Sequence, residues 1–222
     1  MAEEHDHSVE VLDEDGPIEA SEPENLDPDA LERRAAALAE VRKFGDPVLR
    51  SVASPVTEFD RDLADEVERM VAIMRDAMGV GLAATQLGIL RRVLVFQAGH
   101  DAPPTALVNP VIEWGSREEL ATAEEGCLSL PGIVVDVERP LFVRVQAQDP
   151  VGEPISVEAS GLEARVIQHE LDHLDGVLIV QRTTREQRKG AMRALREGET
   201  YAPPRPEDED EGAPAADPAG AA

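Results

Sequence analysis

Cysteine, aromatic residues and long apolar runs are all scarce in this chain of 222 residues. Its single cysteine, Cys127, excludes an internal disulfide and suits a reducing compartment. No apolar run approaches the roughly 20 residues that a membrane-spanning helix needs. The N-terminus lacks the basic start and apolar stretch of a secretory signal, and its acidity is the opposite of a transit peptide. We therefore expect a cytoplasmic protein with no disulfide partner and no membrane partner.

Positive charge is scarce as well, and the negative charge is concentrated at the two ends. The formal net charge is −25. Residues 1–30 contain twelve acidic residues and no Lys or Arg, and residues 203–222 contain six against Arg205, which leaves only −8 for residues 31–202. Such a chain repels phosphate backbones, so direct DNA or RNA binding by the whole protein is not expected. Residues 181–200, with six basic and three acidic residues, form a local basic segment.

Composition divides the chain into three parts. The acidic residues 1–30 and the acidic, Pro- and Ala-rich residues 203–222 have little to bury, and we expect both to be disordered extensions. Residues 31–202 are long enough for one hydrophobic core and show no internal repeat. We expect a single, monomeric domain there.

Hydrophobic periodicity within residues 31–202 predicts an α+β fold. Helical spacing favours helices over residues 31–42, from an N-cap at Asp60 to Gly79, over Leu162–Leu174 and over residues 184–198. β-branched or alternating stretches favour antiparallel strands; these are Val93–Phe96, Ala106–Trp114, Ile133–Val137, Leu141–Gln148, Ile155–Glu158 and a short Val177–Val180. Strands grouped in a block and flanked by helices indicate α+β. The expected architecture is antiparallel sheets packed around a central helix, with a further helix at the C-terminus.

The strongest chemical signal is the HExxH pattern His169–His173 inside a predicted helix. Histidines four residues apart lie on one face of a helix, so both can bind one metal ion while Glu170 lies near a metal-bound water. The alternative is a solvated helix face with two ordinary histidines. The motif alone does not decide between the two.

A hydrolytic metal site usually has three protein ligands and one open position. His5, His7 and His100 are poor candidates for the third ligand, since they lie in the acidic head or beside a loop aspartate. Cys127, in the segment EGCLS, is the remaining soft donor, and a thiolate with two imidazoles suits a transition metal. A lone cysteine is, however, more commonly a small buried hydrophobic residue.

The segment GVGLAATQ, residues 79–86, partly imitates a dinucleotide fingerprint. That fingerprint needs a strand before it and a helix after it, whereas here a predicted helix comes first, so we exclude a Rossmann site. Its glycines instead allow a bound peptide to approach the backbone, and Gln86 offers a neutral amide donor to a substrate oxygen. The alternative is a structural turn with Gln86 hydrogen-bonded in the core.

Together, GVGLAATQ, EGCLS and QHELDHLDG resemble, in this order, the three signature motifs of the peptide deformylases, and Phe44–Arg50 resembles that family's N-terminal segment. The resemblance covers roughly residues 41–198. It implies that Cys127, His169 and His173 hold one divalent metal ion, usually Fe2+, with Zn2+, Ni2+ or Co2+ as substitutes. It also implies an enzyme that removes the formyl group from the N-terminal formylmethionine of newly synthesised proteins and releases formate.

The same resemblance implies roles for further residues. Glu170 takes a proton from the attacking water and passes it to the departing amine, while Gln86 and the backbone N–H of Leu128 stabilise the oxyanion. For Arg165, on the same helix, the two alternatives are solvent and the pocket mouth, and we favour the surface. We also expect a ribosome contact through the basic C-terminal helix, whose alternative is a helix with simply solvated charges. The residues expected to bind the methionine side chain and the peptide backbone are Val80, Gly81, Gly126, Leu128, Val166 and His169.

Two other function classes fit parts of the sequence. An HExxH endopeptidase would need a third ligand after His173, and Glu186, Glu197 and Glu199 show none of the usual context for one. A non-catalytic, ribosome-associated homologue would have lost a metal ligand or the base. The chain retains Cys127, His169, Glu170 and His173, which argues against that class.

Overall fold

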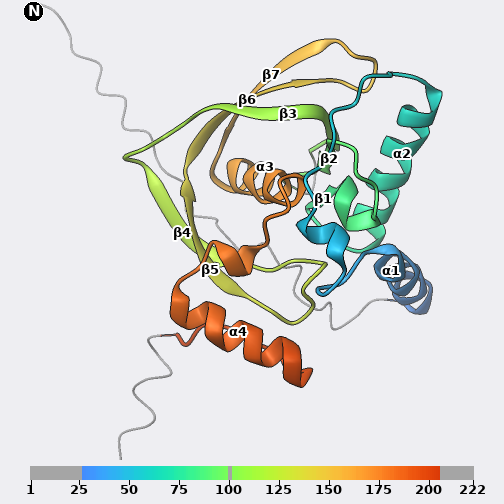
Figure 1. Ribbon diagram of the computed structural model, residues 1–222. Helices are drawn as coiled ribbons and strands as arrows, with labels where there is room; N and C mark the ends of the chain where they lie inside the picture. Colours follow the sequence, from blue (N-terminus) through green and yellow to red (C-terminus); the bar gives the residue numbers. More distant parts are fainter. Residues whose placement is uncertain (1–26, 100–101, 206–222) are drawn as a thin grey trace, which may run out of the picture.

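The computed structural model describes residues 27–99 and 102–205. The extensions expected at residues 1–30 and 203–222 lie mostly outside these ranges, and so do His5, His7 and His100. Within them, two antiparallel sheets lie around one central helix, and a last helix packs beneath the smaller sheet (Figure 1).

The strands follow one another along the chain, with two α-helices before them and two after them. The α-helices are α1 (Pro28–Glu40), α2 (Arg61–Asp76), α3 (Gly161–Leu174) and α4 (Arg185–Glu197). Short 3₁₀ helices are η1 (Pro47–Arg50), η2 (Ala84–Leu87) and η3 (Ile179–Gln181). The strands are β1 (Gly81–Ala83), β2 (Val93–Phe96), β3 (Thr105–Gly115), β4 (Leu120–Glu125), β5 (Val135–Pro140), β6 (Phe142–Gln148) and β7 (Pro154–Ser160).

The sheets confirm the α+β prediction. One sheet has the order β1-β2-β3-β6-β7 with every neighbouring pair antiparallel, and β4 and β5 form a separate antiparallel pair. The helix α3 contacts β1, β2, β6 and β7 of the larger sheet and β5 of the smaller one. The predicted HExxH helix is therefore the central helix, and residues from both sheets surround it.

Helices α1 and α2 lie side by side at one end of the molecule (Figure 1). The carboxylate of Asp60 caps α2 by accepting a hydrogen bond from Leu63 N, as predicted, and the buried face runs through Leu63, Val67, Met70, Ile73 and Met74. Helix α1 begins earlier than the predicted residue 31. Asp27 caps it and Pro28 occupies its first turn, both of which favour a helix start.

One prediction of local structure was wrong, and strand β4 was not predicted. The segment predicted as strand Val177–Val180 leads into the 3₁₀ helix η3, because Gln181 turns back and its side chain accepts a hydrogen bond from Leu178 N. Buried apolar runs this short fit a strand or a helical turn equally well. The strand β4, which the sequence did not suggest, pairs with β5 from Leu120↔Pro140 to Glu125↔Val135.

Buried hydrophobic side chains come from the helices and from both sheets. Leu63, Met70 and Leu82 on one side of the core and Leu130 and Ile133 on the other are fully buried. None of the helices in the described part of the chain has the length and apolar character needed to cross a bilayer.

Candidate metal centre

The HExxH residues lie on the most buried helix of the molecule. Every residue of α3 from Ala164 to Leu174 is buried, which is unusual for a segment that contains charged and polar side chains. His169 and His173 are one turn apart, and their ring centroids are separated by 5.1 Å. The solvated helix face, which the motif alone left open, is therefore excluded.

Cys127 reaches the two histidines from the loop after β4. Its Sγ lies 3.2 Å from His173 Nε2, and the potential ligand atoms of Cys127, His169 and His173 all lie within 4.8 Å of one another. Burial opposes ionisation of the thiol, but the adjacent His173 and His169 hold the pKa of Cys127 well below its ordinary value. The side chain is thus placed as a thiolate ligand and not as an inert buried cysteine.

A buried carboxylate orients one of the rings. His169 Nδ1 lies 3.0 Å from Oε2 of Glu125, which leaves Nε2 to face the other ligands. Burial by itself would raise the pKa of Glu125, but hydrogen bonds from Arg139 and His169 hold it far below its ordinary value. Arg139 donates to both carboxylate oxygens, at 2.5 and 2.8 Å.

Arg165 does not lie at the surface, where the sequence led us to expect it. Its side chain is buried and donates to Glu125 Oε1 at 2.9 Å, to Val137 O at 2.8 Å and to Ala121 O at 2.7 Å. The guanidinium is therefore paired with a charge and also satisfies two strand carbonyls. It joins α3 to both strands of the smaller sheet and supports the carboxylate that orients His169.

Gln86 lies in η2 with its amide fixed toward the ligands. Its Oε1 accepts a hydrogen bond from Ala83 N at 2.8 Å, so its Nε2 is directed to Cys127 Sγ at 3.8 Å and to Ser129 Oγ at 3.3 Å. The neighbouring Thr85 hydroxyl donates to the backbone oxygen of His173 at 3.1 Å. These contacts bring GVGLAATQ, EGCLS and the HExxH helix into one site.

Glu170 lies beside the ligands with an unused acceptor. Its Oε2 is buried and has no hydrogen-bond partner among the described residues. Burial raises the pKa of this carboxyl to about 7. The carboxyl fits closely against Gly81, since a Cβ added there would overlap Glu170 Oε1 and lie 2.9 Å from its Cδ.

A pocket of about 520 Å³ opens onto these groups. It is lined by Gln86, Cys127 and Glu170 and by every residue expected to bind substrate, namely Val80, Gly81, Gly126, Leu128, Val166 and His169. The pocket is also lined by residues that the sequence did not predict: Arg34 and Leu38 from α1, and Thr200, Tyr201 and Ala202 after α4. The one available signal was the four-residue spacing of Arg34 and Leu38, which places them on one face of a helix.

Comparison with known proteins agrees with this geometry. The family model described as polypeptide deformylase matches residues 38–189. The chain is 45% identical over 175 residues to a peptide deformylase of a Parafrankia species, covering 77% of this chain and 92% of that one. It is 47% identical over 162 residues to peptide deformylase 1 of Corynebacterium glutamicum, covering 72% and 95%. The chain belongs to the polypeptide deformylase family.

Solved structures of the family share the fold. The crystal structure of the Thermotoga maritima peptide deformylase has a TM-score of 0.62 at 48% identity, covering 65% of this chain and 96% of that one. The Synechococcus elongatus enzyme, crystallised with actinonin, has a TM-score of 0.67 at 41% identity, covering 72% and 88%. This chain is thus a metal-dependent hydrolase with peptide deformylase activity, and it removes the formyl group from the N-terminal formylmethionine of nascent peptides. Its metal site is formed by Cys127, His169 and His173.

Proposed function

We propose that Glu170 is the proton-transfer residue of this deformylase, and that Gln86 and the backbone N–H of Leu128 stabilise the oxyanion. The observation that carries the proposal is the convergence of three ligand atoms within 4.8 Å beside a buried carboxylate oxygen that has no partner among the described residues. Cys127, His169, Glu170, Gln86 and Leu128 line the same pocket, so a formyl group that enters the pocket meets these residues.

The donor set fits a transition metal. One thiolate and two imidazoles suit soft or borderline divalent ions and suit Mg2+ or Ca2+ poorly. Three protein ligands leave one position for water or substrate. When bound, the metal polarises the formyl oxygen and lowers the pKa of a water from about 15.7 toward 7. We propose Fe2+ in the cell, with Zn2+, Ni2+ or Co2+ as substitutes.

Glu170 has the properties that a proton carrier needs. Its pKa of about 7 means that the carboxylate accepts a proton and the acid returns it at neutral pH. It takes the proton of the attacking water and then delivers it to the nitrogen of the departing amine, which leaves formate and a free N-terminus. The absence of a side chain at Gly81 allows this carboxyl to reach the pocket.

Gln86 supplies a neutral donor whose direction is fixed before substrate binds. Because Ala83 N holds its Oε1, Nε2 is directed to the side of Cys127 and Ser129 without a rotation of the amide. A donor that is already oriented stabilises the developing oxyanion with little reorganisation, and losing one such donor costs about 100- to 1,000-fold in turnover. The N–H of Leu128, directly after the ligand Cys127, is proposed as the second donor.

The substrate peptide is proposed to add a strand to the larger sheet. Strand β1 is at the edge of that sheet, so no strand of the described part of the chain pairs with the outer side of Gly81. Extended peptides bind such edges through backbone hydrogen bonds. The methionine side chain would lie against Val80, Leu128 and Val166, with Gly81, Gly126 and His169 completing its surroundings.

Three further expectations stay proposals. The first is a single catalytic domain, expected at residues 31–202 and extended to Pro28 by the start of α1, between an N-terminal and a C-terminal extension. The second is a cytoplasmic location. The third is a ribosome contact through α4, supported by exposed basic residues on that helix: Arg185, Arg188, Lys189, Arg193 and Arg196. Ribosome cosedimentation that is unchanged after reversing the charges of Arg188, Lys189 and Arg196 would remove this contact. Truncation is a poorer test, because Ala191 and Ala194 are part of the core.

The activity is tested by anaerobic purification, metal analysis and formate release from formyl-Met-Ala-Ser beside the unformylated peptide. Glu170→Ala should retain the metal and lose more turnover than Gln86→Ala, whereas Cys127→Ser should lose metal. Glu163→Gln is the matched control on α3, since Glu163 lies in the first turn, outside the pocket. Cleavage of internal peptide bonds without formate would favour an endopeptidase instead, and metal retained at full strength in Cys127→Ser would contradict the ligand assignment.

A further inference from the structure

The outer wall of the pocket includes segments that the family model does not match. The model matches residues 38–189, but Arg34 and the segment Thr200–Ala202 also line the pocket. The ligands and Glu170 come from α3 and the loop after β4, whereas Arg34 comes from α1. A peptide whose formyl group lies at the ligands must therefore extend past a wall that lies partly outside the residues matched by the family model.

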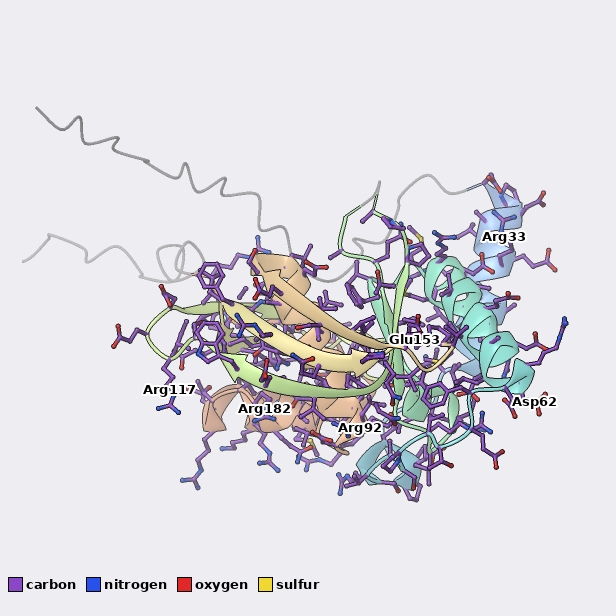
Figure 2. All side chains as sticks on the ribbon, turned by 90° about the horizontal axis from the view of Figure 1, so that it is seen from above. Arg33, Asp62, Arg92, Arg117, Glu153 and Arg182 are labelled. Carbon is purple, nitrogen blue, oxygen red and sulfur yellow. The ribbon has the colours of Figure 1, made fainter. Side chains whose placement is uncertain are left out.

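The orientation of α1 directs Arg34 inward. Leu38, one turn after Arg34, lines the same pocket, and Ala37 is buried against the core. Arg33 is instead directed toward the end of α2, with 58% of its side chain exposed and its Nε 3.9 Å from Asp76 Oδ1. Figure 2 shows Arg33 on α1, the helix beside α2. Two adjacent arginines thus differ in that only Arg34 faces the pocket.

Arg34 has donor capacity that the described part of the chain does not use. Its Nε is buried and has no hydrogen-bond partner there. A guanidinium is always charged and presents five N–H donors in a planar fork that matches a carboxylate. Leaving such a donor unsatisfied is unfavourable, so a carboxylate that enters the pocket gains a charge-assisted pair without breaking an existing one.

Few other charged residues line the pocket, so the charge of Arg34 can discriminate between substrate peptides. Among the described lining residues, Arg34 is the one Arg or Lys and Glu170 is the one Asp or Glu. The protein as a whole carries a net charge of −25, which repels acidic peptides. A local cation on the path of the peptide therefore decides whether an acidic substrate residue is accepted.

We propose that Arg34 is a specificity-determining residue that favours formylmethionyl peptides with Asp or Glu at the second or third position. The proposal rests on the proposed placement of the substrate: the formyl group at the ligands, the methionine side chain at Leu128 and Val166, and the following residues toward α1. The ligand chemistry is a side-chain carboxylate close behind the methionine.

The test compares kcat/KM of the metal-loaded enzyme on formyl-Met-Ala-Ser and on its variants with Asp or Lys at position two or three. The expected ratio of Asp to Lys peptides is about tenfold at low salt, in line with a partly buried charged hydrogen bond, and it should shrink as salt is added. Arg34→Gln should bring the ratio near one, and Arg34→Glu should reverse it. Arg33→Gln should leave both the ratio and the activity unchanged.

Each ratio is taken within one variant, so a general loss of activity does not affect it. A ratio near one in the parent enzyme, or one that persists in both Arg34 variants, would overturn the role of Arg34 while leaving deformylation intact. No formate from any formylated peptide would instead overturn the proposed catalytic assignment. Thermal unfolding of each variant shows that the fold is retained.

Discussion

His169 Nδ1 and Glu125 Oε2 lie 3.0 Å apart, and Glu125 is completely buried. The carboxylate fixes the orientation of the ring and directs Nε2 toward Cys127 and His173. Glu125 is itself held by Arg139 and Arg165, so the geometry of one metal ligand depends on residues of β4, β5 and α3.

Glu125→Gln should therefore weaken metal binding. A glutamine amide has one oxygen that accepts hydrogen bonds, whereas its nitrogen only donates. It therefore cannot accept from both arginines and His169 as the carboxylate does, and the ring loses its support. Changes of this kind typically lower metal affinity about 10- to 100-fold. Metal retained after a timed challenge with a chelator measures the effect. Glu124→Gln is the matched control, because alternation along β4 turns Glu124 to the other face. Equal metal retention in the two variants would contradict this role of Glu125.

Arg165→Lys should destabilise the fold although it preserves the charge. The lysine ammonium carries its donors on one nitrogen and cannot reach Glu125, Val137 O and Ala121 O together. Some of these buried acceptors therefore lose their hydrogen-bond donor. We expect a loss of about 3 kcal/mol in the free energy of unfolding, measured by urea denaturation. Arg144→Lys, at a pair with 46% and 72% of the side chains exposed, should change it by at most about 1 kcal/mol. Similar losses in the two variants would show that burial of the pair is not decisive.

The sequence predicted the parts of the site that depend on local spacing. The four-residue interval between His169 and His173 places both rings on one helical face, and the capping Asp60 predicted the start of α2. Residues whose environment depends on distant partners were missed. Nothing in the sequence of α3 distinguishes Arg165 from a surface arginine. It is buried because its hydrogen-bond acceptors lie on β4 and β5, 28 to 44 residues away in the sequence.

The same limit explains the strands and the pocket wall. In β4, the sequence LATAEE has little β-branched character, and the strand forms through six successive pairs with β5. Val177–Val180 has strand character, but Gln181 turns it into a 3₁₀ helix. Arg34 lies far from every motif in the sequence, and its approach to the pocket follows from the packing of α1 on α2.

Gly81→Ala should reduce turnover without removing the metal. The added methyl group would overlap Oε1 of Glu170, which is proposed to carry the proton, and would force this carboxyl out of position. A displacement of about 1 Å at a reacting group can cost about 100-fold in rate. Formate release and metal content are measured on the same preparation. Gly115→Ala is the control, since its Cβ would meet Pro140 at an ordinary 3.5 Å. Full turnover in Gly81→Ala would argue against the proposed role of Glu170.

The segment after α4 lines the pocket through Thr200, Tyr201 and Ala202. Tyr201 pairs with the chain around Ile133: its N–H donates to Gly132 O, and its carbonyl accepts from Val134 N, both at 2.8 Å. Its ring packs directly on Gly190 of α4, where an added Cβ would overlap the ring atom Cε2 and lie 2.9 Å from Cζ. The contact between helix and ring thus holds this part of the pocket wall in place.

Gly190→Ala should therefore change stability with opposite sign in two backgrounds. In the parent chain the methyl group displaces the Tyr201 ring, and we expect a loss of about 1–3 kcal/mol in the free energy of unfolding. In a Tyr201→Ala background the overlap is gone, and the higher helix propensity of alanine should stabilise the fold by about 0.5–1 kcal/mol. Urea denaturation of the four proteins of this cycle measures both values. The same sign in both backgrounds would show that the ring of Tyr201 does not rest on Gly190 in solution.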